Sequence, residues 1–214
     1  MKPIGIFGGT FDPIHFGHLR TAFELWQALD LAEMRFVPAG RPPHRGTPSC
    51  DPLHRLAMVR AATANQPGFA VDDREVRRDG PTYTVETLRE LRAELGAEPM
   101  LVLVLGSDQL RNLHTWHRWR ELFEHAHLVA TQRERVPLDA LPAEVEAELA
   151  ARGADALPDA PGGAIAFFRM PAVPVSATAL RAQLARGERP DGLSPPAVLD
   201  YIETNGLYRA PSGT

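Results

Sequence analysis

Two histidines near the N-terminus, His15 and His18, are well suited to phosphate chemistry. An imidazole donates a hydrogen bond to a phosphoryl oxygen and, when protonated, adds positive charge. The histidines bracket Gly17 and follow a short apolar stretch, Pro3 to Phe7, and the pair Gly8-Gly9. A strand, a glycine turn and a helix start in this order present free backbone N–H groups and the positive end of the helix dipole to an anion. The pattern predicts a phosphate-binding site.

A second polar segment is expected to face the same site. The unbroken apolar run Met100 to Leu105 predicts a strand buried on both faces, and the loop Gly106-Ser107-Asp108 follows it directly. In open α/β sheets, ligands bind beyond the carboxyl ends of the strands. We therefore expect Gly106 and Asp108 to lie in the crevice that holds the two histidines.

For two further stretches, the sequence does not decide between a ligand-binding role and a purely structural one. The Gly- and Pro-rich loop 39–46 carries His44 and Arg45, which could reach a phosphate, although its composition alone favours an ordinary solvated loop. Trp116 lies three residues before Trp119, so both could pack into the core from one helical face. Trp116 could instead serve as a platform for a ligand ring.

Apolar strands alternate with amphipathic helices along the chain, which predicts parallel strands joined by right-handed crossovers. We expect a single-domain α/β protein with a Rossmann-like, doubly wound, mostly parallel sheet and helices on both faces. Segment 72–79 is interpreted as a charged loop, and 136–161 as a variable excursion with one helix. The predicted helix caps are Thr82 or Thr84, Ser176 or Thr178, and Ser194. The predicted strands are Pro3–Phe7, Met34–Pro38, Phe69–Val71, Met100–Leu105, His125–Thr131 and Ala164–Arg169, and the main helices are 18–31, 51–65, 82–96, 143–152, 176–187 and 194–205.

Composition narrows the classes of function. The chain has 214 residues, 44% of them apolar, which is enough for one domain with a buried core. The formal charge of −4 argues against broad nucleic-acid binding, although it allows a local basic pocket for a triphosphate. The lone Cys50 excludes a disulfide framework and a multi-cysteine zinc site, and we interpret it as a bystander in a loop.

The sequence also suggests where the protein works. It has no signal-peptide pattern, and no apolar run approaches the ~20 residues of a membrane span. We expect a cytoplasmic protein with neither membrane nor nucleic-acid partners. A homo-oligomer is compatible with the sequence.

The run Gly5 to His18 resembles the G-x-F-x-P-x-H-x-G-H signature of the nucleotidylyltransferase superfamily. Members transfer a nucleoside monophosphate from ATP or CTP to an acceptor and release pyrophosphate. The segment Ser176 to Arg181 resembles the second motif of the superfamily, a Ser/Thr-rich helix start followed by arginine. Hydroxyl and N–H groups at a helix start can hold phosphates, and the arginine adds a forked donor.

Four further segments are similar to those of bacterial nicotinate-nucleotide adenylyltransferases, a family within this superfamily. The resemblance spans nearly the whole chain, from Ile4 to Tyr208. It implies adenylyl transfer from ATP to nicotinate mononucleotide, with Mg²⁺ held mainly by the ATP phosphates. The segments are Gly8–Pro13, Pro42–Arg45, Pro81–Thr84 with Glu86–Leu88, and Gly106–Asp108 followed by Leu113 and Trp116.

The resemblance also implies a role for each matching residue. His15 and His18 would contact the ATP phosphates, with His18 at the α-phosphate, and Ser176, Thr178 and Arg181 would hold the outgoing pyrophosphate. Trp116 would stack on the pyridine ring, and Thr84 with the backbone after Trp116 would receive the ring carboxylate, with Tyr83 and His117 beside it. The other residues implied in ATP or phosphate binding are Gly8, Gly9, Thr10, Phe11, His44, Arg45, Gly106 and Asp108.

Two departures from the family pattern and several rival functions stay open. Glu86 stands where the family usually has Asp, and Ala177 where a second Ser or Thr is frequent. The acceptor could be nicotinamide mononucleotide or another phosphorylated compound. A non-catalytic ATP-binding regulator on the same fold is a further alternative, which the presence of both histidines and Arg181 disfavours.

Overall fold

The structure, a computed structural model, describes residues 2–42, 48–133, 141–171 and 173–209. The centre of this part of the chain is one six-stranded sheet in the order β3-β2-β1-β4-β5-β6, and every neighbouring pair is parallel. The chain winds outward from β1 to one edge and then from β4 to the other. This is a doubly wound, Rossmann-like sheet whose switch point lies between β1 and β4. The strands are β1 (Ile4–Gly9), β2 (Glu33–Pro38), β3 (Phe69–Val71), β4 (Leu101–Gly106), β5 (His127–Arg133) and β6 (Ile165–Met170).

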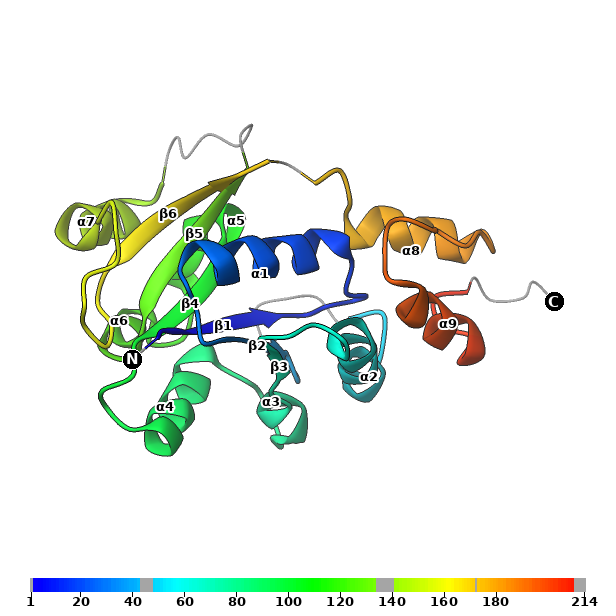
Figure 1. The fold of residues 1–214 in the computed structure, drawn as a ribbon, viewed down its shortest axis with the longest axis horizontal. Coiled ribbons are helices and arrows are strands. Elements are labelled where there is room, and N and C mark those ends of the chain that lie inside the picture. The colour runs from blue at the N-terminus through cyan, green and yellow to red at the C-terminus, as the bar shows by residue number, and fades with distance from the viewer. Residues whose placement is uncertain (1, 43–47, 134–140, 172, 210–214) are drawn as a thin grey trace.

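Helices cover both faces of the sheet, as the sequence predicts (Figure 1). The residues of β4 alternate between two cores, with Leu103 and Leu105 in one and Val102 and Val104 in the other. Because both faces are covered, an unbroken apolar run is the pattern that this strand requires. The helices are α1 (Phe16–Ala28), α2 (Pro52–Thr63), α3 (Arg74–Arg77), α4 (Thr84–Leu95), α5 (Ser107–Arg111), α6 (Leu122–His125), α7 (Ala143–Arg152), α8 (Ala177–Ala185) and α9 (Pro196–Thr204).

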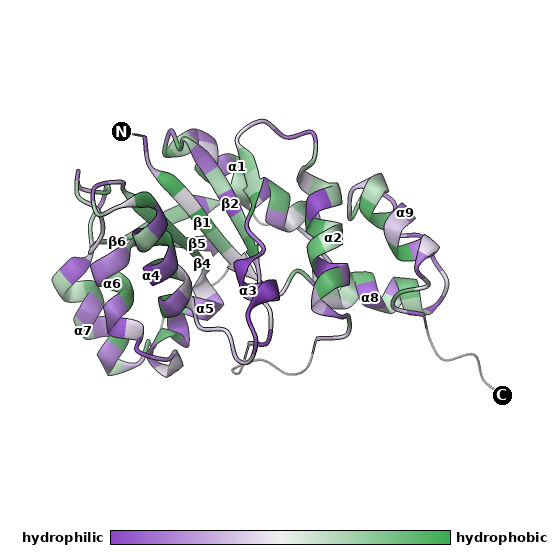
Figure 2. Ribbon diagram, turned by 90° about the horizontal axis from the view of Figure 1, so that it is seen from below, coloured by the Kyte–Doolittle hydropathy of each residue, from purple (hydrophilic) through white to green (hydrophobic). Residues whose placement is uncertain are grey.

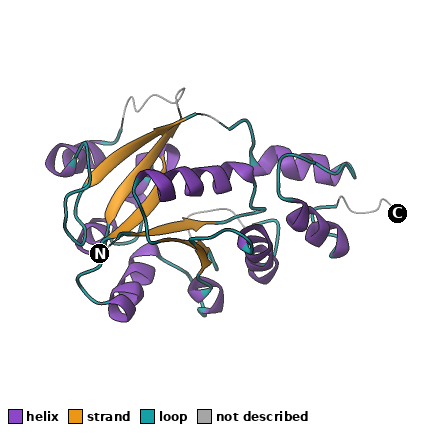
Figure 3. Ribbon diagram, in the orientation of Figure 1, coloured by secondary structure: helices purple, strands orange, loops and turns teal. Residues whose placement is uncertain are grey.

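Two C-terminal helices lie apart from the faces of the sheet. Figure 3 shows α8 and α9 beyond the carboxyl end of β1, next to the start of α1. Figure 2 shows hydrophobic residues along the central strands, whereas the short helix α3 is largely hydrophilic. The last described segments of the chain therefore lie near the carboxyl ends of the strands, where ligands bind in such folds.

The six predicted strands are all present, with ends shifted by a few residues, but several local predictions are wrong. Segment 72–79 was expected to be a charged loop, but it contains the helix α3. The side chain of Glu75 in this helix is buried and does not face solvent. Helix α5 begins at Ser107, within a segment predicted to be a loop.

Of the three predicted caps, one is confirmed and two are wrong. The prediction of Ser176 or Thr178 for α8 is confirmed by Ser176, which accepts a hydrogen bond from the Ala179 N–H. Ser194 precedes the cap position of α9 and donates its hydroxyl to the carbonyl of Ile14. Thr82 and Thr84 flank the cap position of α4, which Tyr83 occupies without a side-chain hydrogen bond.

In the ranges that the structure describes, no helix has the length and apolar content needed to cross a membrane.

Candidate active site

A cavity of about 440 Å³ lies at the carboxyl ends of β1 and β4, where the doubly wound topology predicts a ligand. It brings together the N-terminal motif, the residues after β4, and the start of α8. The lining includes Gly8, Gly9, Thr10, Phe11, His15, His18, Gly106, Asp108 and Arg181. The structure thus joins segments that the sequence separates.

The two histidines form the N-terminal cap of α1. The His15 Nδ1 accepts from the Gly17 N–H at 3.1 Å, and the His18 Nδ1 accepts from the His15 N–H at 3.3 Å. Their rings stack with centroids 3.8 Å apart. Because each Nδ1 is an acceptor, each neutral ring carries its proton on Nε2 and can donate from that atom.

The glycine turn approaches its surroundings closely on one side and leaves space on the other. A Cβ on Gly9 would lie 2.8 Å from the ring of Phe11, so this position requires glycine. A Cβ on Gly8 would meet no protein atom within 4 Å, and the space beside it belongs to the cavity. Phe11 has a left-handed φ of 49°, and its ring packs edge-on against His18. The turn therefore leaves its backbone accessible to a bound group.

Arg181 reaches the cavity from α8, as its spacing after Ser176 suggests. Its Nη1 donates to the backbone carbonyl of Asp12 at 2.7 Å. Ser176 and Thr178 are exposed on the first turn of the helix and are not among the residues that line the cavity. Their predicted contact with phosphate stays a prediction. His44 and Arg45 lie outside the described residues.

A second, narrower cavity of about 100 Å³ adjoins the first along Gly8, Gly9 and Thr10. It is lined by Tyr83 and Thr84 at the start of α4 and by Trp116 and His117. The rings of Tyr83 and His117 lie 4.4 Å apart. Trp116 is half-buried, whereas Trp119 is buried in the core as predicted.

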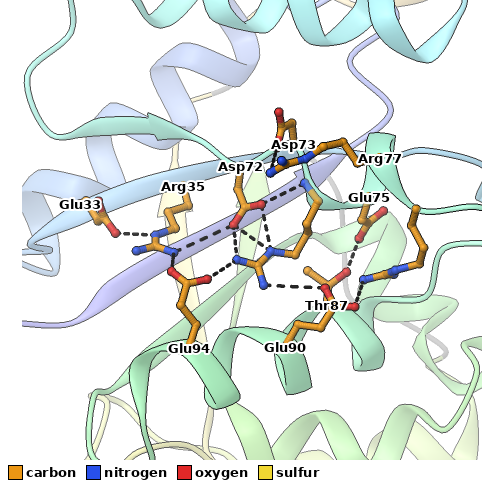
Figure 4. Close-up of polar contacts among 11 residues, drawn as sticks. Glu33, Arg35, Asp72, Asp73, Glu75, Arg77, Thr87, Glu90 and Glu94 are labelled. Atoms are coloured by element: carbon orange, nitrogen blue, oxygen red, sulfur yellow. Dashed lines mark hydrogen bonds and ion pairs between the residues drawn. The ribbon is translucent and has the colours of Figure 1, made fainter.

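Sequence reasoning missed a buried carboxyl group beside this second cavity. Glu75 accepts a hydrogen bond from the Thr87 hydroxyl at 2.7 Å, and burial raises the pKa of Glu75 despite the hydroxyl and N–H groups around it. Figure 4 shows this contact beside a network in which Asp72, Arg35 and Glu94 converge. The Arg74 guanidinium joins Asp72 to Glu94. These bonds fix α4 against β2 and α3, and α4 carries one wall of the cavity.

Sequence reasoning also missed Arg55 and the role of Asp12. Arg55 is fully buried on α2, a helix for which the sequence suggested no role for this residue, and it donates to the carbonyls of Thr10 and Ala39. Asp12 is 7% exposed and lines the larger cavity. Its position inside the N-terminal motif was the available signal, whereas nothing in the sequence distinguished Arg55.

Comparison with known proteins agrees with this geometry. The chain matches the cytidylyltransferase-like family over residues 6–183. It is 50% identical to a protein of Pseudomonas fluorescens and 46% identical to one of Dechloromonas aromatica, each named "Probable nicotinate-nucleotide adenylyltransferase", over at least 97% of both chains.

The fold is shared with a solved structure of nicotinic acid mononucleotide adenylyltransferase from Plasmodium falciparum in complex with NaAD. The TM-score is 0.75 at 19% identity, covering 97% of this chain and 98% of the other. With relatives that match it from end to end, the chain belongs to the nicotinate-nucleotide adenylyltransferases of the cytidylyltransferase-like family.

Proposed function

We propose that this protein transfers AMP from ATP to nicotinate mononucleotide, giving nicotinate adenine dinucleotide and pyrophosphate in NAD biosynthesis. The observation that carries the proposal is the junction of two cavities at the glycine turn. One is lined with phosphate donors and the other with aromatic rings. A triphosphate in the first and a pyridine nucleotide in the second would meet at Gly8 to Thr10, where the chemistry must occur.

The larger cavity supplies donors for the reacting phosphates. The Nε2–H groups of His15 and His18 and the backbone of the glycine turn would hold the α-phosphate oxygens as charge develops on them. Arg181 would receive the outgoing pyrophosphate, with Ser176 and Thr178 at the start of α8. The attacking 5′-phosphate of the acceptor is already an anion, so the step requires no general base. Catalysis then consists of positioning and charge stabilisation.

The smaller cavity would bind the acceptor. Trp116 offers a half-buried face on which an electron-poor pyridine ring can stack. The first turn of α4, which begins at Thr84 without a side-chain cap, presents N–H groups and the positive end of a helix dipole to the ring carboxylate. An uncharged amide would gain less from this dipole, which favours the acid over the amide.

The residues of the cavity fit a magnesium ion held mainly by substrate. In the described ranges, no group of three or more His, Cys, Asp or Glu side chains could hold a metal by itself. Asp108 lines the cavity and could supply one carboxylate ligand. When bound, Mg²⁺ would neutralise charge on the phosphate oxygens.

The test is pyrophosphate release from ATP and Mg²⁺ with nicotinate mononucleotide and nicotinamide mononucleotide in parallel reactions. A marked preference for the acid is the expected result. Equal rates would retain adenylyl transfer but remove the proposed carboxylate site at Thr84. If the protein binds ATP but releases no pyrophosphate with either nucleotide, adenylyl transfer to these acceptors is refuted. That result would favour a non-catalytic ATP-binding regulator.

A further inference from the structure

A carboxylate lies inside the cavity that we assign to the triphosphate. Asp12 lines this cavity and is 7% exposed, so its negative charge would oppose a bound phosphate unless other groups engage it. Both of its oxygens have donors. The Oδ2 accepts from the Ser49 N–H at 2.7 Å, and the Oδ1 accepts from the Tyr208 hydroxyl at 2.7 Å. The second donor comes from the far end of the chain.

Tyr208 is held in an unusual backbone conformation for this contact. Its φ of 61° lies in the left-handed region, which costs a non-glycine residue energy and persists where surrounding contacts impose it. Its ring packs against the core that contains Phe11 and Ile14. Burial and the neighbouring Asp12 raise the pKa of Tyr208, so its phenol stays protonated and acts as the donor.

Arg181 lies beside the same carboxylate without pairing fully with it. Its Nη1 donates to the backbone carbonyl of Asp12 at 2.7 Å, but lies 4.0 Å from the carboxylate Oδ2. Arg55, also near this carboxylate, is fixed by the carbonyls of Thr10 and Ala39. Of these two guanidinium groups, Arg181 is the one that can move closer to Asp12 if that carboxylate loses a donor.

We propose that Tyr208 is a positioning residue that occupies the Asp12 carboxylate and thereby keeps the charge of Arg181 available to the pyrophosphate of ATP. The inference rests on the proposed function, in which Arg181 meets the outgoing pyrophosphate. Without the Tyr208 hydroxyl, the Asp12 carboxylate loses the donor at its Oδ1 and carries a less compensated charge. That charge draws Arg181, already 4.0 Å from Oδ2, into a closer ion pair. The phosphates must then break that pair before they bind.

The test is a double-mutant cycle on Tyr208 and Asp12. Tyr208→Phe removes one hydroxyl and retains the ring. It is expected to raise the KM for ATP and the Kd for a non-hydrolysable ATP analogue about 10-fold, the scale of one charge-assisted hydrogen bond. In an Asp12→Asn background, the same substitution should change either constant less than about 2-fold, because no carboxylate remains to capture Arg181. The KM for nicotinate mononucleotide should change little in either background.

A matched control removes a hydroxyl from the same region. Tyr201, on α9, makes a 2.9 Å hydrogen bond to His54 and does not line the cavity. Tyr201→Phe should leave the ATP constants unchanged. Thermal unfolding of each variant, monitored by circular dichroism, sets an assay temperature at which all of them are folded.

Two outcomes would overturn the inference. One is an ATP analogue Kd that Tyr208→Phe leaves unchanged. The other is an equal increase in the Asp12 and Asp12→Asn backgrounds, which would indicate a purely structural role for the hydroxyl. The proposed function would be refuted by a different result, a wild-type protein that binds ATP but releases no pyrophosphate. Even then, the Kd values of the ATP analogue in the double-mutant cycle would still test the role of Tyr208.

Discussion

Arg55→Met should destabilise the fold and weaken the binding of both substrates. Arg55 is fully buried on α2 and joins the ends of two strands. Its Nη1 donates to the Thr10 carbonyl at 2.6 Å, and its Nη2 donates to the Ala39 carbonyl at 2.6 Å and to the Gly40 carbonyl at 3.1 Å. Its Nε donates to the Cys50 carbonyl at 3.2 Å. Thr10 lines both cavities and Ala39 lines the smaller one.

The magnitude follows from the bonds that methionine cannot replace. Methionine fills much of the arginine volume, so the cavity contribution is small. The carbonyls belong to the backbone and remain in place. A hydrogen bond to a charged group is worth about 1.5–3 kcal/mol, so the two shortest bonds to Arg55 alone correspond to about 3–6 kcal/mol. Burial lowers the pKa of Arg55, which reflects a desolvation cost that methionine avoids, so the lower half of the range is expected.

Urea unfolding of wild type and Arg55→Met measures this loss, with steady-state KM values for both substrates taken at low denaturant. Arg60→Met is the matched control on the same helix. Arg60 is 56% exposed and pairs only with Asp73 in the described part of the chain, so its loss should cost under about 1 kcal/mol. If Arg55→Met also costs under about 1 kcal/mol, the argument from unpaired carbonyls is refuted. If stability falls while both KM values hold, Arg55 supports the fold without shaping the cavities.

Three further predictions concern single residues at the site. His18→Ala should lower kcat about 10²–10³-fold in the pyrophosphate assay, more than it raises the KM for ATP, and an unchanged kcat would remove His18 from transition-state binding. Trp116→Ala should raise the KM for the pyridine nucleotide about 10-fold, and an equal rise for ATP would make Trp116 a core residue only. Glu75 has a pKa raised above 4.5, so folding favours its protonated form, and its contribution to stability is greatest below that pH and declines as the pH rises through the folded pKa. Glu75→Gln should remove this decline from the unfolding free energy measured against pH. Arg74 lowers the pKa of Glu94, so this carboxylate adds stability that is lost as the pH falls, and Glu94→Gln should remove that loss instead.

The sequence was most informative where a short run of residues carries the whole pattern that the structure requires. The run Met100 to Leu105 predicted a strand buried on two faces, and β4 occupies that position between two cores. The motif around His15 and His18 predicted a helix start beside a glycine turn, and the two imidazoles form that cap. The cap contacts of α1 lie within three residues of one another. The burial of β4 depends on distant strands and helices, but the unbroken apolar run is itself the pattern that such burial requires.

The prediction failed where a residue's role depends on a distant partner. Segment 72–79 resembled a solvated loop because charged residues usually face water. Its helix depends on Glu75 meeting the Thr87 hydroxyl and on Arg74 meeting Glu94, contacts that local pattern does not encode. Ser194 similarly resembled a helix cap, but its hydroxyl reaches Ile14, far away in the sequence.

The phosphate turn shows why the motif alone cannot form the site. Phe11 holds a left-handed φ of 49°, a conformation that costs a non-glycine residue about 1–3 kcal/mol. In a short peptide this turn would relax, because the glycines beside it allow many other conformations. In the protein, Arg55 anchors the carbonyl before Phe11, and Ser49 and Tyr208 hold the carboxylate after it. The N-terminal motif therefore supplies the phosphate donors, while α2 and the C-terminal segment hold them in the geometry that binding requires.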